Sequence, residues 1–165
     1  MVQTQTPDSA NRMTKSGQIP IEHLAMLLDE IHLAIAWDRP SILIAVHRSR
    51  VARERAMIAL EKMLAECLVV QVKPDEESGI LSGLVQRNTP QPTIFFIVGL
   101  GNQEKVYDEL NLHREKIIEH GLRLIFWLSP KELVALSRRA PDFWAFRHQV
   151  VEFPSVRRSR KKDDG

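Results

Sequence analysis

Short runs of mostly apolar residues alternate along this chain with longer segments of helical periodicity. The runs lie at residues 41–46, 68–72, 93–98, 122–128 and 149–153. The first and the third contain one polar residue each, which is typical of strands that are covered on both faces of a sheet. We therefore expect five strands, with the first and the third in the interior of the sheet.

The segments between these runs predict helices. One apolar stripe predicts a helix that starts near Pro20 and ends before Pro40; it consists of Leu24, Leu27, Leu28, Ile31 and Ile35. Other helices are expected at about residues 51–66 and 103–120, with a short one around residues 80–85. The residues Ser129 to Glu132 form a capping box that predicts a helix from Pro130, interrupted at Pro141.

Strands that alternate with helices favour a parallel sheet with right-handed crossovers. The predicted fold class is therefore α/β, a three-layer sandwich with a mostly parallel sheet of about five strands. Residues 19–154 form a single α/β domain in this interpretation. Residues 1–18 are polar and aperiodic, and residues 155–165 are basic, so both are expected to be disordered.

Composition narrows the class of protein further. The chain has 165 residues, 44% of them hydrophobic, and a formal net charge of +2, so no global field marks a nucleic-acid or membrane binder. The single cysteine, Cys67, excludes an internal disulfide and is compatible with a cytoplasmic location. No apolar run approaches the ~18 residues that span a bilayer, and no membrane association is expected.

Several segments taken together resemble a known bacterial domain. They are Trp37-Asp38-Arg39-Pro40, Leu110-Asn111, Trp127-Leu128, Ala140 to Trp144, and Phe153. This set resembles the N-terminal domain of certain bacterial tetratricopeptide-repeat proteins, related to the STAND/AAA+ group of P-loop ATPases, over roughly residues 22–154. The resemblance implies that the first strand corresponds to the Walker A strand, the third to the Walker B strand and the fourth to the sensor strand.

The sequence departs from the ATPase pattern at each catalytic point. A P-loop needs glycines and a Lys-Ser/Thr pair, but residues 47–54 contain neither glycine nor lysine. The third strand ends in Gly99, where an acidic partner of Mg²⁺ would lie. The chain is therefore interpreted as a degenerate P-loop NTPase-like domain that is no enzyme and uses no cofactor.

A weak anion site is the first candidate for binding chemistry. His47, Arg48, Ser49 and Arg50 follow the first strand at the start of a helix, where α/β folds bind ligands and helix N-termini favour anions. The alternative interpretation is a degenerate, empty loop. The six histidines show no spacing typical of a metal site, and none is predicted.

The basic tail is the second candidate. Nucleic acid is the ligand that it suits, through Arg157, Arg158, Arg160, Lys161 and Lys162. The alternative is a solvated, disordered end. The aromatic residues Trp127, Phe143, Trp144 and Phe146 are expected in the core and not on a base-stacking surface.

The leading functional hypothesis is a protein-interaction domain, an adaptor or regulatory domain derived from a nucleotide-binding fold. Met26 and Leu33 are apolar but lie off the inward stripe of the first helix, so they are the candidate contacts to another protein or a second copy of the chain. The alternatives are an anion- or nucleotide-binding regulatory subunit and an RNA- or DNA-associated accessory subunit that uses the tail.

Overall fold

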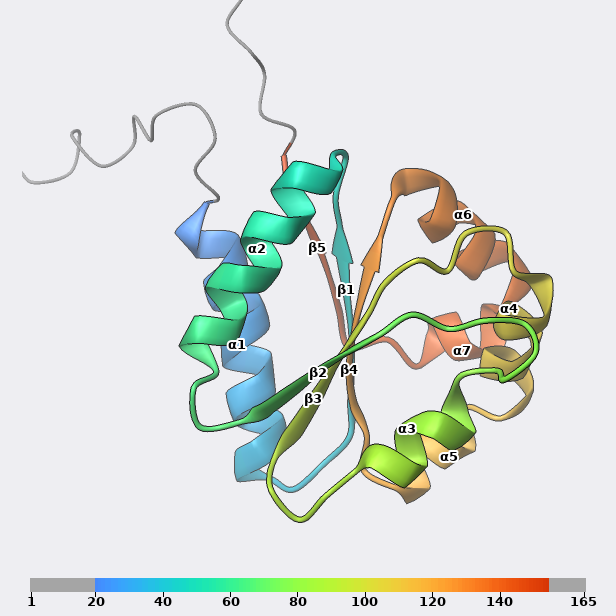
Figure 1. The fold of residues 1–165 in the computed structure, drawn as a ribbon, viewed down its shortest axis with the longest axis horizontal. Helices are drawn as coiled ribbons and strands as arrows, with labels where there is room; N and C mark the ends of the chain where they lie inside the picture. Colours follow the sequence, from blue (N-terminus) through green and yellow to red (C-terminus); the bar gives the residue numbers. More distant parts are fainter. Residues whose placement is uncertain (1–19, 155–165) are drawn as a thin grey trace, which may run out of the picture.

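Five parallel strands form one sheet in the computed structural model, which describes residues 20–154 (Figure 1). The predicted leader and basic tail lie outside the described residues. The strands are β1 (Ser41–Val46), β2 (Leu68–Val72), β3 (Thr93–Ile97), β4 (Arg123–Leu128) and β5 (Gln149–Glu152). Their order across the sheet is β2-β3-β4-β1-β5, and every pairing is parallel. The prediction of an α/β fold with a parallel sheet is confirmed.

Helices cover both faces of the sheet, as Figure 1 shows. One face carries α1 (Ile21–Ala36) and α2 (Arg50–Met63). The other face carries α3 (Leu81–Arg87), α4 (Glu104–Leu112), α5 (Glu115–Glu119), α6 (Pro130–Arg139) and α7 (Pro141–Ala145). The three layers predicted from the sequence are therefore present.

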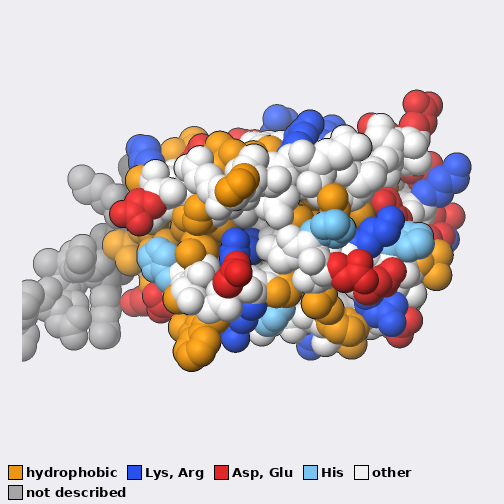
Figure 2. Space-filling model, turned by 90° about the horizontal axis from the view of Figure 1, so that it is seen from below, with side chains coloured by type: hydrophobic (Ala, Val, Ile, Leu, Met, Phe, Trp, Pro, Cys, Tyr) orange, Lys and Arg blue, Asp and Glu red, His pale blue; other side chains and the backbone are white. Residues whose placement is uncertain are grey.

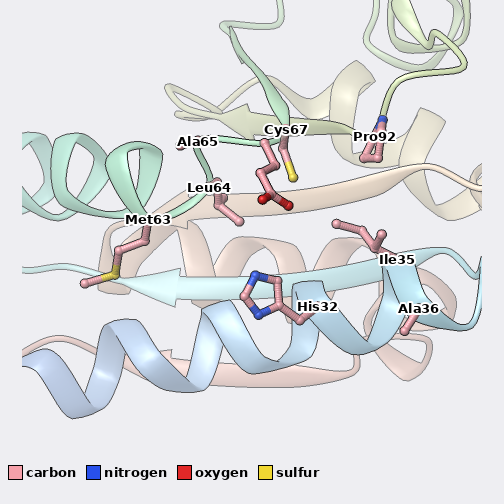
Figure 3. A pocket seen from close by; sticks show the side chains of 9 residues that line it. His32, Ile35, Ala36, Met63, Leu64, Ala65, Cys67 and Pro92 are labelled. Carbon is pink, nitrogen blue, oxygen red and sulfur yellow. The ribbon is translucent and has the colours of Figure 1, made fainter.

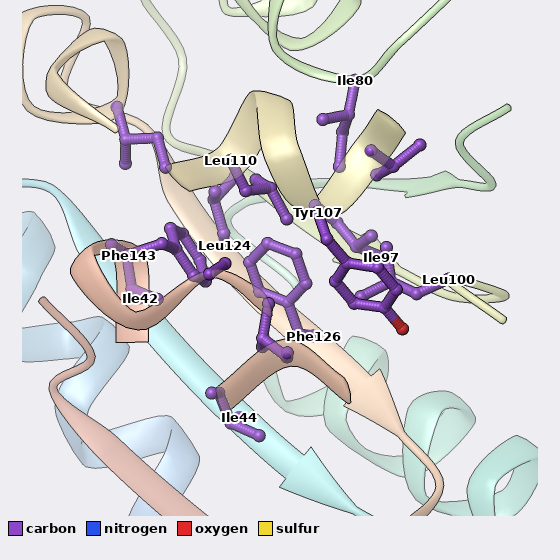
Figure 4. Packing of buried hydrophobic residues seen from close by; sticks show 14 of the residues in the cluster. Ile42, Ile44, Ile80, Ile97, Leu100, Tyr107, Leu110, Leu124, Phe126 and Phe143 are labelled. Atoms are coloured by element: carbon purple, nitrogen blue, oxygen red, sulfur yellow. The ribbon is translucent and has the colours of Figure 1, made fainter. Parts of the chain in front are cut away.

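Two hydrophobic cores lie on the two faces of the sheet. Alternate residues of β1 belong to opposite cores, because successive side chains of a strand point to opposite faces of the sheet. Ile42 and Ile44 pack with α3 to α7, whereas Leu43 and Ala45 pack with α1 and α2. Figure 4 shows the first core, where Phe126 of β4 meets Phe143 of α7 edge to face with ring centroids 5.4 Å apart. Both β1 and β3 are fully buried, as their apolar composition predicts.

The predicted helix at residues 103–120 is wrong, because the chain forms two helices there. The guanidinium of Arg114 donates a hydrogen bond to the Asn111 carbonyl (2.7 Å), the acceptor that the backbone of Glu115 would need in a continuous helix. The two helices α4 and α5 are separated at this point. The capping box of α6 is confirmed by its two reciprocal hydrogen bonds between Ser129 and Glu132.

The aromatic residues near α7 are only partly in the core. Trp127 and Phe143 are fully buried, but Trp144 is half-buried and Phe146 is exposed, so the expectation for Phe146 is wrong. Both outer rings carry a cation instead: the Arg114 guanidinium lies 5.5 Å from the centroid of Phe146, and that of Arg147 lies 4.2 Å from Trp144. A guanidinium over an aromatic face is favourable at an exposed site, so these rings are stabilised without burial.

Candidate functional site

The carboxyl edge of the sheet has a topological switch point between β1 and β4. The chain leaves β1 toward α2 on one face of the sheet and leaves β4 toward α6 on the other (Figure 1). In open α/β sheets, ligands bind in the crevice that such a divergence creates. His47 follows β1 at this switch point, and Ser129 and Glu132 follow β4.

His47 is buried at this switch point, in surroundings that favour its uncharged form. Its side chain is 8% exposed, and neither ring nitrogen has a hydrogen-bond partner among the described residues. Burial lowers the pKa of His47 from its usual value near 6.5, the neighbouring Arg53 lowers it further, and Glu132 opposes both with a smaller effect. The carbonyls of Trp127 and Ser49 also favour the protonated ring, although neither forms a hydrogen bond of ordinary geometry. A neutral imidazole offers no positive charge to an anion.

The other residues of the predicted anion site surround the N-terminus of α2. Ser49 is the N-cap, and its hydroxyl accepts a hydrogen bond from the backbone of Ala52 at 3.0 Å. Glu54 contacts Arg53 at 3.0 Å and Arg50 at 3.9 Å. One backbone donor of this N-terminus is thus used internally, and a carboxylate already lies among its cations. The four predicted residues are brought to one turn, but His47 faces the interior while Arg48 and Arg50 are exposed.

Glu132 lies on the β4 side of the switch point and binds two backbone groups. One carboxylate oxygen accepts a hydrogen bond from the backbone of Ser129 (3.0 Å), and the other accepts one from Gly101 (2.7 Å), in the loop that follows β3. The phenol of Tyr107 donates to the Gly101 carbonyl at 2.6 Å. Burial, helped by the negative charge of Glu132, raises the pKa of Tyr107 to about 12. Glu132 therefore joins the ends of β3 and β4 where backbone amides would otherwise be available to an external anion.

The same arrangement recurs at the N-terminus of α3. The carboxylate of Glu109, from α4, accepts hydrogen bonds from the backbones of Ile80 (2.8 Å) and Leu81 (3.0 Å). Gly79, at φ +68, makes room for it, since a Cβ there would lie 2.5 Å from the nearer carboxylate oxygen. A carboxylate of the chain thus occupies the position that a phosphate would take at this helix.

Sequence reasoning did not find these two carboxylates in their long-range roles. The motif around Ser129 indicates that Glu132 caps its own helix, but the contact to Gly101 spans 31 residues and depends on β3 and β4 being neighbours. Glu109 lies 28 to 29 residues from the backbone groups it binds. A carboxylate that binds the N-terminus of a helix from a distant segment of the chain leaves no local signal in the sequence.

Met26 and Leu33, the predicted contacts of α1, are exposed at 42% and 44%. Trp37, which continues the last turn of α1, is 73% exposed. Their spacing of seven and four residues places the three side chains on one face of the helix. We call these three residues the α1 outer face. Asp29 and Glu30 lie along it, so the apolar face has acidic neighbours.

A cavity of about 570 Å³ opens between the C-terminal parts of α1 and α2. Figure 3 shows the side chains at its walls, with His32 and Ile35 from α1, Met63 and Leu64 from the end of α2, and Cys67 before β2. It lies at the amino edge of the sheet, seen in Figure 2, where hydrophobic side chains are mixed with both signs of charge. Burial raises the pKa of the Cys67 thiol, so this cysteine is a poor nucleophile.

The remaining chemistry of the chain is limited. Within residues 20–154, no group of three His, Cys, Asp or Glu side chains could hold a metal ion. No helix in the same range is long and apolar enough to cross a membrane. The basic candidates from Arg157 to Lys162 lie outside the described residues. A comparison of the sequence with known protein families and with curated proteins finds no match.

Proposed function

We propose that this chain is a non-catalytic α/β domain that binds another protein through the α1 outer face, as an adaptor or regulatory domain derived from a nucleotide-binding fold. The observation that carries the proposal is the row of Met26, Leu33 and Trp37, three large apolar side chains exposed on one face of one helix. Single exposed apolar residues are ordinary on a protein surface, but an aligned group of them is typical of an interface.

The residues at the switch point support a protein-binding role over nucleotide chemistry. The switch point is where this fold class binds ligands, and here it holds the neutral ring of His47 beside the carboxylate of Glu132. A nucleotide phosphate would meet that negative charge and would have to displace Glu132 from Gly101 and Ser129. Descent from a P-loop domain rests on the resemblance of the sequence alone, because the turn after β1 lacks the glycines and the lysine of a P-loop.

The partner's chemistry follows from the surroundings of the α1 outer face. An apolar row flanked by Asp29 and Glu30 fits a complementary apolar surface with a rim of lysine or arginine. Burial of the exposed parts of Met26, Leu33 and Trp37 supplies the affinity, and the acidic neighbours add orientation. A large aromatic side chain such as Trp37 is the type of residue that contributes most at interfaces.

The test is a charge substitution on this face. Met26→Asp with Leu33→Asp should leave the melting temperature nearly unchanged, because both side chains are already exposed, and should remove the complex on size-exclusion chromatography. Ile118→Asp with Val134→Asp is the matched control, since these residues are 46% exposed on the opposite helical layer. Retention of the complex by the Met26/Leu33 variant would refute this interface. Loss of the complex by both variants would point to a general effect of added charge.

A further inference from the structure

The outer edge of β2 carries backbone groups that no strand of the described chain uses. β2 is the first strand in the order β2-β3-β4-β1-β5, so it pairs with β3 alone. The N–H of Leu68 donates to the residue before β3 at 2.8 Å, and the carbonyl of Val72 accepts from the residue after β3 at 3.0 Å. Successive residues of a strand direct their backbone groups to opposite sides, so the N–H and C=O of Val69 and Gln71 point away from β3.

β2 also lacks the features that usually protect the edge of a sheet. Edge strands are commonly very short or carry charged residues, proline or a bulge. The opposite edge strand, β5, has four residues and ends in Glu152, whereas β2 reads Leu-Val-Val-Gln-Val with neither charge nor proline. Leu68 is 39% exposed and the three valines are half-buried. Figure 1 shows the sheet from this edge, with β2 in front. An apolar edge with free donors and acceptors fits another β-strand.

We propose that β2 pairs antiparallel with β2 of a second copy of this chain, so that the two sheets become one continuous sheet across a two-fold axis at Val70. The proposal goes beyond the α1 outer face. It concerns a different surface, and its partner is the chain itself.

The charges at the two ends of β2 favour a second copy as the partner. Glu66 precedes the strand and Lys73 follows it; both are exposed, and neither forms an ion pair with another residue of the range 20–154. The Lys73 side chain lies along Gly99, and its flexible stem lets the ammonium turn to the edge. Antiparallel pairing of identical segments brings the acidic end of each strand to the basic end of the other. Two-fold symmetry makes this contact twice.

The backbone selects the register of the pair. With Val70 on the axis, Val69 of each strand lies opposite Gln71 of the partner subunit, and such pairs exchange both of their N–H to C=O hydrogen bonds. A register centred on Val69 would require the N–H of Cys67, which already donates to the Leu64 carbonyl at 2.8 Å. A register centred on Gln71 would move the opposite charges at the strand ends apart. The centre at Val70 satisfies both the free backbone groups and the charges.

Charge reversal tests this arrangement through the mass of the full chain, measured by sedimentation equilibrium. The expected mass of the dimer is about 38 kDa, twice the 19.0 kDa of the chain. Glu66→Lys should weaken the dimer about 10- to 100-fold, because both contacts between opposite charges become contacts between like charges. Lys73→Glu should do the same, and the two substitutions together should restore the dimer. The matched control is Glu152→Lys, the same change on the opposite edge strand, which should leave the dimer intact.

Amide hydrogen exchange provides a second measurement at the strand itself. The N–H groups of Val69 and Gln71 should be protected in the dimer and should exchange rapidly in the Glu66→Lys variant. The N–H of Leu68 is the internal control, because its hydrogen bond lies on the β3 side and should protect it in both proteins. This comparison also shows that the variant remains folded.

The proposal is overturned by any of three results. The first is a monomer at about 100 μM protein, a concentration above the dissociation constant of a specific dimer. The second is a dimer that Glu66→Lys weakens no more than Glu152→Lys does, or that the double reversal fails to restore. The third is a dimer that the Met26/Leu33 variant abolishes and Glu66→Lys retains, which would assign self-association to the α1 outer face. Loss in each single reversal with recovery in the double reversal supports pairing through β2.

Discussion

Substitution of Glu132 by alanine tests whether this carboxylate holds the carboxyl edge together. The side chain accepts two backbone hydrogen bonds, from Ser129 at the start of α6 and from Gly101 after β3. It also places a negative charge in the first turn of α6, where the helix dipole favours it. The Glu132→Ala variant loses all three contributions, while the reciprocal bond from its own backbone N–H to the Ser129 hydroxyl remains.

The expected loss of stability follows from these contacts. A hydrogen bond to a charged group contributes about 1.5–3 kcal/mol when buried, and about 1 kcal/mol here because the carboxylate is half exposed. With a dipole contribution of about 0.5 kcal/mol, Glu132→Ala should lower the free energy of unfolding by about 2–3 kcal/mol. At this chain length that corresponds to a fall in Tm of about 5–10 °C. Glu132→Gln keeps an acceptor but loses the charge, so about 1 kcal/mol is expected.

Urea denaturation followed by far-ultraviolet circular dichroism measures these differences. Glu22→Ala is the matched control, because Glu22 lies in the first turn of α1 and makes no hydrogen bond or ion pair within the described residues. It should change stability by no more than about 0.5 kcal/mol, the size of a dipole effect at an exposed site. Amide exchange at Gly101 should accelerate in Glu132→Ala alone. Equal stability of Glu132→Ala and the control would refute the role of Glu132 as a link between β3 and β4.

Two further predictions concern the pKa of His47 and the backbone at Gly79. The pKa of His47 in the folded protein lies below its unfolded value near 6.5, so the unfolded state binds more protons between these two pKa values. The free energy of unfolding should therefore fall as the pH drops below about 6.5. Urea midpoints measured from about pH 5 to 8 should depend less on pH in the His47→Leu variant. Gly79→Ala should lower the free energy of unfolding by about 1–3 kcal/mol in the same assay, because φ at Gly79 is +68 and the added Cβ displaces the Glu109 carboxylate. Gly83→Ala is the control, since the space around Gly83 is open, and it should stabilise α3 by up to about 1 kcal/mol.

The strands could be predicted from the sequence because burial on both faces leaves a simple signature. Residues 41–46 and 93–98 have almost no polar positions, and β1 and β3 are indeed buried along their whole length. The break between α4 and α5 leaves no such signature. Apolar residues continue at helical spacing through Val106, Leu110 and Ile117. At the break, the Asn111 carbonyl accepts a hydrogen bond from the Arg114 side chain.

The position of the candidate site could be predicted from the sequence, but the contacts between its residues could not. A turn after the first parallel strand lies at the carboxyl edge in any such fold, which placed residues 47–50 correctly. The sequence does not state the strand order, however, and the order decides which segments meet. Glu132 reaches Gly101 because β3 and β4 are neighbours, and the chain after Phe153 begins beside Val46 because β5 pairs with β1. A charge count along the chain could not have found either contact.

The strand order also divides the carboxyl edge into two halves of opposite chemical character. On the β3–β4 side, the acceptor oxygens of Glu132 use the backbone donors of Ser129 and Gly101, so this half is closed to an external anion. On the β1–β5 side, Arg48 and Arg50 are exposed at the turn after β1, next to the backbone of Phe153 that follows β5. A phosphate group would therefore have to displace Glu132 to reach the backbone donors of Ser129 and Gly101.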